Sequence, residues 1–88
     1  MTNVSEWSVY IIEACDGSLY TGVTTDVERR FAEHGNPLKG AKYFRGRTPI
    51  RVVYTESQPD RGTALRREAE IKKLKRESKL ELIKGGSG

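Results

Sequence analysis

Trp7-Ser-Val-Tyr-Ile-Ile-Glu-Ala14 and Leu19-Tyr-Thr-Gly-Val-Thr-Thr25, with Asp16-Gly17 between them, are the stretches that decide the fold. Both runs are rich in aromatic and β-branched residues, which fit the pleated surface of a sheet. An Asp-Gly pair between two such runs is a strong signal for a tight turn. The sequence therefore predicts a β-hairpin over these residues.

A helix is predicted directly after the hairpin. Thr25-Asp-Val-Glu28 has the spacing of a capping box, in which a side-chain oxygen accepts from backbone N–H groups and a Glu follows three positions later. The helix is expected to run from about Asp26 to His34. Gly35-Asn36-Pro37 should end it, because the first two residues tolerate left-handed backbone and proline cannot continue a helix.

The second half of the chain is predicted to hold one strand and two helices. Residues 38–49 mix glycines, cations and aromatics, which indicates either a loop or a short helix within one, and we expect them to be irregular and basic. Ile50–Glu56 is β-branched enough for a third strand. Pro59-Asp60 supplies a turn and a cap for a long helix from Arg61 to Arg76, and Ser78-Lys-Leu-Glu81 has the spacing of a second capping box that starts a short terminal helix. The element order is thus ββα-βαα, an α/β (α+β) arrangement.

The 88 residues allow one small domain, which we expect over residues 1–84 with a flexible tail at 85–88. The longest apolar run, Val9-Tyr-Ile-Ile12, is far shorter than a bilayer span. The N-terminal residues lack the pattern of a secretory signal, and the single cysteine, Cys15, cannot form an internal disulfide. These features predict a soluble cytoplasmic protein with no membrane partner, and they leave the oligomeric state open.

Basic charge is segregated along the chain. Residues 1–28 carry five acidic residues and no Lys or Arg, for a net charge of −5, whereas residues 29–88 carry all 16 basic residues against seven acids, for a net charge of +9. Such asymmetry favours a polyanionic partner such as nucleic acid, because neutralised phosphates release condensed counterions. Solvated helix faces explain the same charge in many small proteins, so charge alone leaves both interpretations open.

One carboxylate lies on the apolar side of the predicted long helix. Ala64, Leu65, Ile71 and Leu74 mark that side at helical spacing, and Glu68 falls in the middle of the stripe. An ionised carboxylate in such a position must pair with a cation, bind a metal or take up a proton. Glu68 is therefore either half of a structural ion pair or a functional residue.

The predicted first helix and the hairpin each offer residues suited to phosphate chemistry. Arg30 and His34 are four residues apart on one helix face, where a guanidinium can hold a phosphate and an imidazole can exchange a proton near neutral pH. The alternative is that Arg30 is a solvated surface charge and His34 a favourable helix-end residue. Tyr10 and Tyr20 lie on adjacent strands, and Gly22 marks a place where another group comes close.

The spacing of these residues resembles that of the GIY-YIG nuclease superfamily. The blocks that carry the resemblance, which spans residues 7–83, are Ser8-Val9-Tyr10, Tyr20-Thr21-Gly22, Asp26-Val-Glu-Arg-Arg-Phe-Ala-Glu-His34 and Arg67-Glu68-Ala-Glu-Ile-Lys72. Lys39-Gly-Ala-Lys-Tyr43 and Arg45-Gly-Arg47 further resemble its small stand-alone bacterial branch. The chain departs from the signatures at Ser8, where the first has glycine, and at Thr21, where the second usually has an apolar residue.

The resemblance implies a three-stranded antiparallel sheet flanked by helices and metal-assisted hydrolysis of phosphodiester bonds. It implies that Tyr20 activates water as the general base or assists in doing so, and that Tyr10 positions that water or the phosphate. It implies that Arg30 stabilises charge on the phosphate, with His34 at the position four residues later, and that Glu68 is the single carboxylate holding Mg²⁺ or Mn²⁺. Mg²⁺ needs few protein ligands and keeps several waters, so one Glu suffices.

The basic segment at 38–49 supplies candidate nucleic-acid contacts, with Tyr43 or Phe44 available to stack on an unpaired base. The candidates are Lys39, Lys42, Tyr43, Arg45 and Arg47. The leading hypothesis is a Mg²⁺-dependent endonuclease-like enzyme acting on DNA in preference to RNA. The alternatives are a nucleic-acid-binding module with little or no turnover, and an interaction protein whose basic helix Arg66–Lys79 docks an acidic partner.

Overall fold

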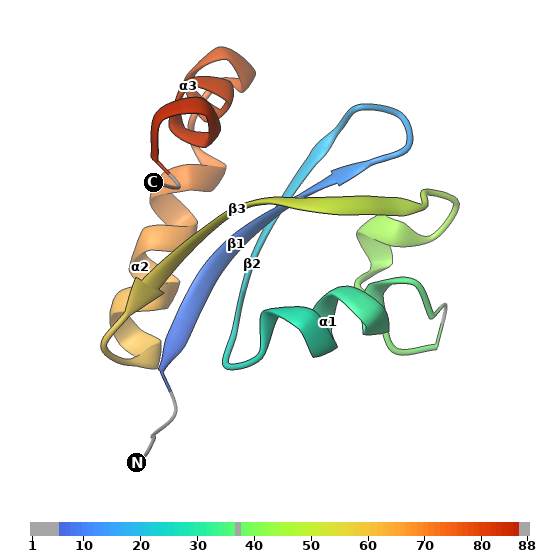
Figure 1. Ribbon diagram of the computed structural model, residues 1–88, viewed down its shortest axis with the longest axis horizontal. Helices are drawn as coiled ribbons and strands as arrows, with labels where there is room; N and C mark the ends of the chain where they lie inside the picture. The colour runs from blue at the N-terminus through green and yellow to red at the C-terminus, as the bar shows by residue number, and fades with distance from the viewer. Residues whose placement is uncertain (1–5, 37, 87–88) are drawn as a thin grey trace.

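The computed structural model describes residues 6–36 and 38–86, and within them three strands form one antiparallel sheet with helices on both faces (Figure 1). In chain order the elements are β1 Trp7–Ala14, β2 Leu19–Thr24, α1 Val27–His34, the short 3₁₀ helix η1 Lys42–Phe44, β3 Pro49–Gln58, α2 Arg61–Lys72 and α3 Arg76–Gly86. The strand order is β2-β1-β3. The predicted fold class, hairpin and element order are confirmed.

β1 is the central strand, and both of its faces are buried. Val9 and Ile11 point to the layer formed by α2 and α3, whereas Tyr10 and Ile12 point to the layer formed by α1 and η1. Successive side chains of a strand point to opposite faces, so a strand covered on both sides reads as a continuous apolar run. This double burial explains why Val9–Ile12 is the longest apolar stretch of the chain.

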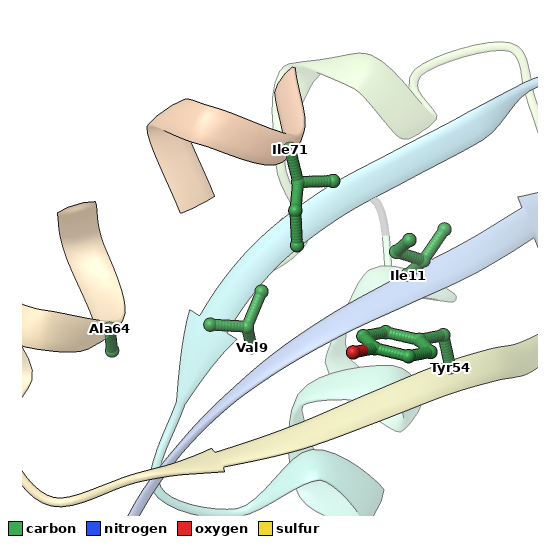
Figure 2. Packing of buried hydrophobic residues seen from close by; sticks show 5 residues of the cluster. All are labelled: Val9, Ile11, Tyr54, Ala64 and Ile71. Carbon is green, nitrogen blue, oxygen red and sulfur yellow. The ribbon is translucent and has the colours of Figure 1, made fainter. Parts of the chain in front are cut away.

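The core between the sheet and α2 is built from Val9, Ile11, Tyr54, Ala64 and Ile71, which Figure 2 shows converging from two strands and one helix. Ala64 and Ile71 are completely buried, as their places on the predicted apolar stripe require. Side chains of α3 pack against the same cluster at Leu82 and Ile83. This packing fixes the face of α2 that is turned to the sheet, and thereby fixes where Glu68 lies.

The start and end of α1 differ in detail from the prediction. The N-cap is Asp26 and not Thr25: its side chain accepts a hydrogen bond from the Arg29 N–H. Thr25 was one residue too early because Asp26 itself has the extended backbone and the short carboxylate that a cap needs. Gly35 closes the helix with right-handed backbone at a φ of −77°, so the expected left-handed cap is wrong. Pro37 lies outside the described residues.

The boundary between the two C-terminal helices lies earlier than predicted. α2 ends at Lys72, and α3 starts at Arg76, two residues before the cap predicted at Ser78 and within the span given to the long helix. Leu74, placed on the apolar stripe, lies beyond the end of α2 and is 37% exposed. A straight helix would carry the following residues away from the sheet. The break turns the chain back, so that the apolar side chains of α3 join the core.

The remaining differences are extensions of predicted elements. β3 is longer at both ends than Ile50–Glu56, and the basic segment contains η1, the short helix within a loop that the sequence allowed. α3 continues through Gly86, within the stretch predicted as a tail. No helix in the described part of the chain is long and apolar enough to cross a membrane.

Thr21 supplies a prediction about stability. Its side chain is buried and its hydroxyl oxygen has no hydrogen-bond partner among the described residues. An unpaired buried hydroxyl costs about 1–3 kcal/mol, so Thr21→Val should raise the free energy of unfolding by about 1 kcal/mol. The measurement is urea denaturation.

Thr24→Val is the matched control in the same strand. The Thr24 hydroxyl is also buried, but it accepts from the Asp26 N–H and donates to the Asp26 carbonyl. Thr24→Val should therefore lower the free energy of unfolding by about 1 kcal/mol. Equal losses in the two variants would contradict this account of Thr21.

Candidate active site

The candidate site starts where Tyr10 crosses the neighbouring strand. Tyr10 on β1 is directly opposite Gly22 on β2. A Cβ atom at Gly22 would lie 2.5 Å from the Tyr10 hydroxyl oxygen, which is closer than any real contact. The absence of a side chain at Gly22 therefore lets the Tyr10 ring lie flat across β2.

The Tyr10 hydroxyl is hydrogen-bonded to His34 at the end of α1, with 2.8 Å between the oxygen and Nε2. The other ring nitrogen, Nδ1, accepts from the backbone N–H of Ala41 at 3.3 Å. Since an N–H donor faces Nδ1, the imidazole proton is on Nε2 and is donated to Tyr10. The hydroxyl proton of Tyr10 is then available to another acceptor.

The segment after α1 folds back over the end of that helix. A Cβ atom at Gly40 would lie 2.8 Å from the Cα atom of His34, so only glycine fits this close approach. Nη1 of Arg30 donates to the Lys39 carbonyl at 3.0 Å and to Glu33 Oε1 at 2.9 Å. These contacts hold the start of the basic segment against α1. Gly40 was not identified from the sequence, because no motif links it to His34 six residues earlier.

Burial sets the protonation of the Tyr10–His34 pair. Burial lowers the pKa of His34 to about 4; the Arg30 charge acts in the same direction and Glu33 opposes it. Burial also raises the pKa of Tyr10 well above its ordinary range; Tyr20 and Glu68 add to the shift and Arg30 opposes it. At neutral pH both groups are uncharged. His34 thus orients Tyr10, and the expected proton exchange near neutral pH is not supported.

Tyr20 is half-buried at the centre of an aromatic cluster. Its ring centroid lies 5.2 Å from that of His34, and 5.1 Å from those of both Tyr43 and Phe44. Phe44 is 7% exposed and belongs to the core beneath Tyr10, so the prediction that it could stack on a base is wrong. The sequence could not reveal this burial, because the helix that carries Phe44 is only three residues long and has no apolar periodicity to detect.

Glu68 approaches the same cluster from α2, on the other layer. Its side chain is 18% exposed, and Oε2 lies 3.2 Å from Lys72 Nζ. Lys72 Nζ in turn lies 6.0 Å from the Tyr20 ring centroid, above the ring. Tyr10, Tyr20 and His34 therefore lie side by side, and Glu68 reaches Tyr20 through Lys72. Arg30 is bonded to the segment that folds over His34.

The donor set fits a hard cation that keeps most of its water. No group of three or more His, Cys, Asp or Glu side chains suited to a metal occurs in residues 6–36 and 38–86. That absence does not suit a closed structural site, which needs four protein ligands. A single, mostly enclosed carboxylate that already holds an ammonium ion suits Mg²⁺, which takes one or two carboxylates together with water and phosphate oxygens. Glu68 is the residue that would hold it.

The basic segment divides into engaged and free cations. Arg47 Nε lies 2.9 Å from Asp16 Oδ2, its Nη1 donates to the Tyr43 carbonyl, and its guanidinium carbon lies 4.3 Å from the Tyr43 ring centroid. Arg47 thus joins the segment to the hairpin turn. Lys39, Lys42 and Arg45 are exposed and remain the candidates for contact with a phosphate backbone.

A partly buried network of hydrogen bonds joins α2 to β3, and the sequence did not reveal it. Glu56 accepts from the Tyr54 hydroxyl at 2.5 Å and from Arg67 Nε at 3.0 Å. Arg67 immediately precedes Glu68 on α2. The network therefore fixes the rotation of the helix turn that carries the candidate metal ligand, and sequence spacing gave no indication of this pairing between separate elements.

The fold and this arrangement define a known class of protein. Residues 6–81 match the model of the GIY-YIG catalytic domain. The chain therefore belongs to the GIY-YIG family, whose members are generally nucleases. The resemblance inferred from the sequence is confirmed.

The similar proteins carry the family name UPF0213. The chain is 56% identical over 79 residues to a UPF0213 protein of Haloquadratum walsbyi, covering 90% of this chain and 88% of the relative. It is 41% identical over 85 residues to the UPF0213 protein YhbQ of Escherichia coli, covering 97% and 84%. The NMR structure of a UPF0213 protein from Bacillus halodurans matches with a TM-score of 0.60 at 48% identity, covering 94% of this chain and 87% of that one.

The Gly22–Tyr10 contact predicts the effect of adding one methyl group. Gly22→Ala should push the Tyr10 ring off β2 and break its bond to His34, lowering the free energy of unfolding by about 1–3 kcal/mol. Urea denaturation measures the loss, and imidazole NMR signals report the bond. Gly62→Ala on α2 is the control: its Cβ would meet nothing nearer than 3.4 Å, so it should be neutral or stabilising. Equal effects would contradict the contact.

The buried imidazole predicts a dependence of stability on pH. The pKa of His34 is about 4 in the folded protein and 6.5 as an ordinary value, so between these pH values the unfolded chain binds a proton that the folded protein does not. The contribution is complete above pH 6.5 and falls by up to about 3 kcal/mol as pH drops to 4. Urea denaturation across this window should show the slope, and His34→Gln, which keeps a donor for Tyr10, should reduce it. An NMR titration with a pKa near 6.5 would contradict the burial argument.

Proposed function

We propose that the protein is a metal-dependent endonuclease that hydrolyses phosphodiester bonds in DNA. The observation that carries the proposal is the convergence of Tyr10, Tyr20, Arg30 and Glu68 from one hairpin and two helices. Membership of a family of nucleases supports the reaction class. The segregated positive charge supports a polyanionic substrate. The exposed thiol of Cys15 suits the cytoplasm, which we propose as its location.

Each group has a task in the proposed reaction. A water oxygen would form a bond to phosphorus while the bond from phosphorus to the leaving sugar oxygen breaks. As the general base, Tyr20 would first give its hydroxyl proton to solvent and then take a proton from the water, and solvent would protonate the leaving oxygen. Tyr10, with His34 donating to its oxygen, uses its own proton to position the water or a phosphate oxygen. Arg30 stabilises the additional negative charge. Mg²⁺ or Mn²⁺ held by Glu68 supplies Lewis-acid stabilisation when bound.

The proposed substrate path follows the exposed cations after α1. Lys39, Lys42 and Arg45 would contact the phosphate backbone, and Tyr43, which is half-buried beside Tyr20, would contact a base. Arg47 is already paired with Asp16, so its task would be to hold this segment in place. These contacts carry no sequence information, and we propose binding that does not depend on sequence.

A second candidate is a nucleic-acid-binding module with little or no turnover. The observation in its favour is the Glu68–Lys72 pair, which satisfies the carboxylate without a metal. This candidate requires salt-sensitive DNA binding that survives Glu68→Gln and weakens on removal of charge at Lys42 or Arg45. Metal-dependent cleavage by the unmodified protein would reject it.

Cleavage of labelled DNA with Mg²⁺ or Mn²⁺ tests the proposal. Glu68→Gln and Arg30→Ala should each lower the rate at least ~100-fold, because groups that stabilise transition-state charge contribute about that much. Glu68→Gln should leave DNA affinity in EDTA intact or increased, since a negative charge is removed.

Matched controls separate the site from general charge effects. Arg29→Ala removes the exposed neighbour of Arg30, and Glu77→Gln removes an exposed carboxylate on α3. Both should cleave at the rate of the unmodified protein. Equal residual cleavage by all four variants would point to a contaminating nuclease and reject the assignment.

A further inference from the structure

Lys72 joins two residues of the candidate site. Its ammonium lies 3.2 Å from Glu68 Oε2 and 6.0 Å from the Tyr20 ring centroid, above the ring. No role of its own was predicted for Lys72 from the sequence; it is the last residue of the block Arg67–Lys72 that carries the family resemblance. The i, i+4 spacing from Glu68 was the signal that could have identified it.

The two side chains of the Glu68–Lys72 ion pair differ in their exposure to solvent. The Glu68 side chain is 18% exposed, whereas that of Lys72 is 52% exposed. A long, solvated side chain therefore reaches in to cover a carboxylate that is mostly enclosed. Ion pairs with such exposure contribute little free energy, so the ammonium can leave the carboxylate easily. The other helical pairs in the described residues join Arg29 and Arg30 to Glu33, and Arg67 to Glu70, and none of these places a cation over an aromatic ring.

We propose that Lys72 is a further catalytic residue, which occupies the cation position at Glu68 in the metal-free protein and contacts the substrate phosphate once a divalent cation binds there. The proposal rests on the proposed function. Its ligand is a phosphodiester oxygen, for which an ammonium with three donors is well suited. The ammonium stays beside Tyr20 throughout, since its flexible stem needs only to turn from the carboxylate to the phosphate.

Lys72 also neutralises the negative charge of Glu68 in the metal-free protein. Arg30 is paired with Glu33, so an uncovered Glu68 would repel an approaching phosphate. Lys72 cancels that charge before any metal arrives. Removing Lys72 should therefore weaken DNA binding in EDTA when Glu68 is present, and less so when Glu68 is replaced by Gln.

Lys72→Met, Lys72→Arg and the neighbouring control Lys73→Met test the proposal through three measurements. Lys73 is also exposed and lies at the end of α2. The measurements are kcat and KM for DNA cleavage, Mn²⁺ affinity without DNA by electron paramagnetic resonance, and DNA affinity in EDTA for single variants and for Glu68→Gln/Lys72→Met.

Lys72→Met should lower kcat at least ~10-fold, as expected for loss of a donor to transition-state charge, and Lys72→Arg should restore part of the rate. The same variant should bind Mn²⁺ about twofold to fivefold more tightly, because a weak competitor for Glu68 has been removed. Lys73→Met should change neither. A merely structural pair would leave kcat within about twofold of the unmodified protein and Mn²⁺ affinity the same as in Lys73→Met, which would overturn the proposal.

The outcomes separate this inference from the proposed function. If the unmodified protein cleaves and Lys72→Met cleaves equally well, the role of Lys72 fails and the nuclease assignment stands. If the unmodified protein does not cleave under any condition, the nuclease assignment fails. The catalytic role of Lys72 then fails with it, whereas the Mn²⁺ and EDTA measurements still decide whether Lys72 covers the cation position.

Discussion

The hydrogen bond between the Tyr10 hydroxyl and the His34 imidazole is the interaction on which the candidate site depends. It joins the central strand to the last residue of α1, 24 positions later in the chain. Two glycines make it possible: Gly22 lets the Tyr10 ring cross β2, and Gly40 lets the following segment approach the His34 backbone. A side chain at either position would clash with Tyr10 or with the His34 backbone and prevent the contact.

The same bond explains why buried polar groups can be kept in so small a core. A hydroxyl or imidazole without a partner in this position would cost several kcal/mol, roughly the net stability of a small domain. Tyr10, His34 and the Ala41 N–H satisfy one another in a chain, and burial keeps both side chains uncharged. Polar groups that are satisfied in this way are rigid, and rigidity is what a site that positions water requires.

The two halves of the site come from opposite layers of the molecule. Tyr10 and Tyr20 belong to the face covered by α1, whereas Glu68 and Lys72 come from α2 on the other face. They meet because β2 is an edge strand, so side chains of α2 can reach around it to Tyr20. A larger sheet with another strand beyond β2 would separate them. The small size of the fold thus assists the site.

The sequence predicted the strands and the order of elements because those depend on local patterns, whereas the roles of the candidate site residues stay a prediction. Aromatic and β-branched residues located β1, Asp60 predicted the start of α2, and Glu68 on the apolar stripe marked the candidate site on that helix. The break between α2 and α3 was predicted, but about four residues too late, because its position depends on packing of Leu82 and Ile83 on a distant core. Burial of Phe44, the tie between Arg67 and Glu56, and the double contact of Lys72 likewise depend on elements far apart in the chain.

The central claim is that one place on this surface, beside Tyr20, receives both the cation and the phosphate. Paramagnetic broadening by Mn²⁺ in the NMR spectrum of the isotope-labelled protein tests it most directly, without any need for turnover. The account predicts that amide signals near Glu68 and Tyr20 broaden first, and that a short DNA oligonucleotide extends the effect to Arg30. Broadening centred on exposed carboxylates elsewhere, such as Glu77 and Glu81 on α3, with the signals near Glu68 unchanged, would contradict it.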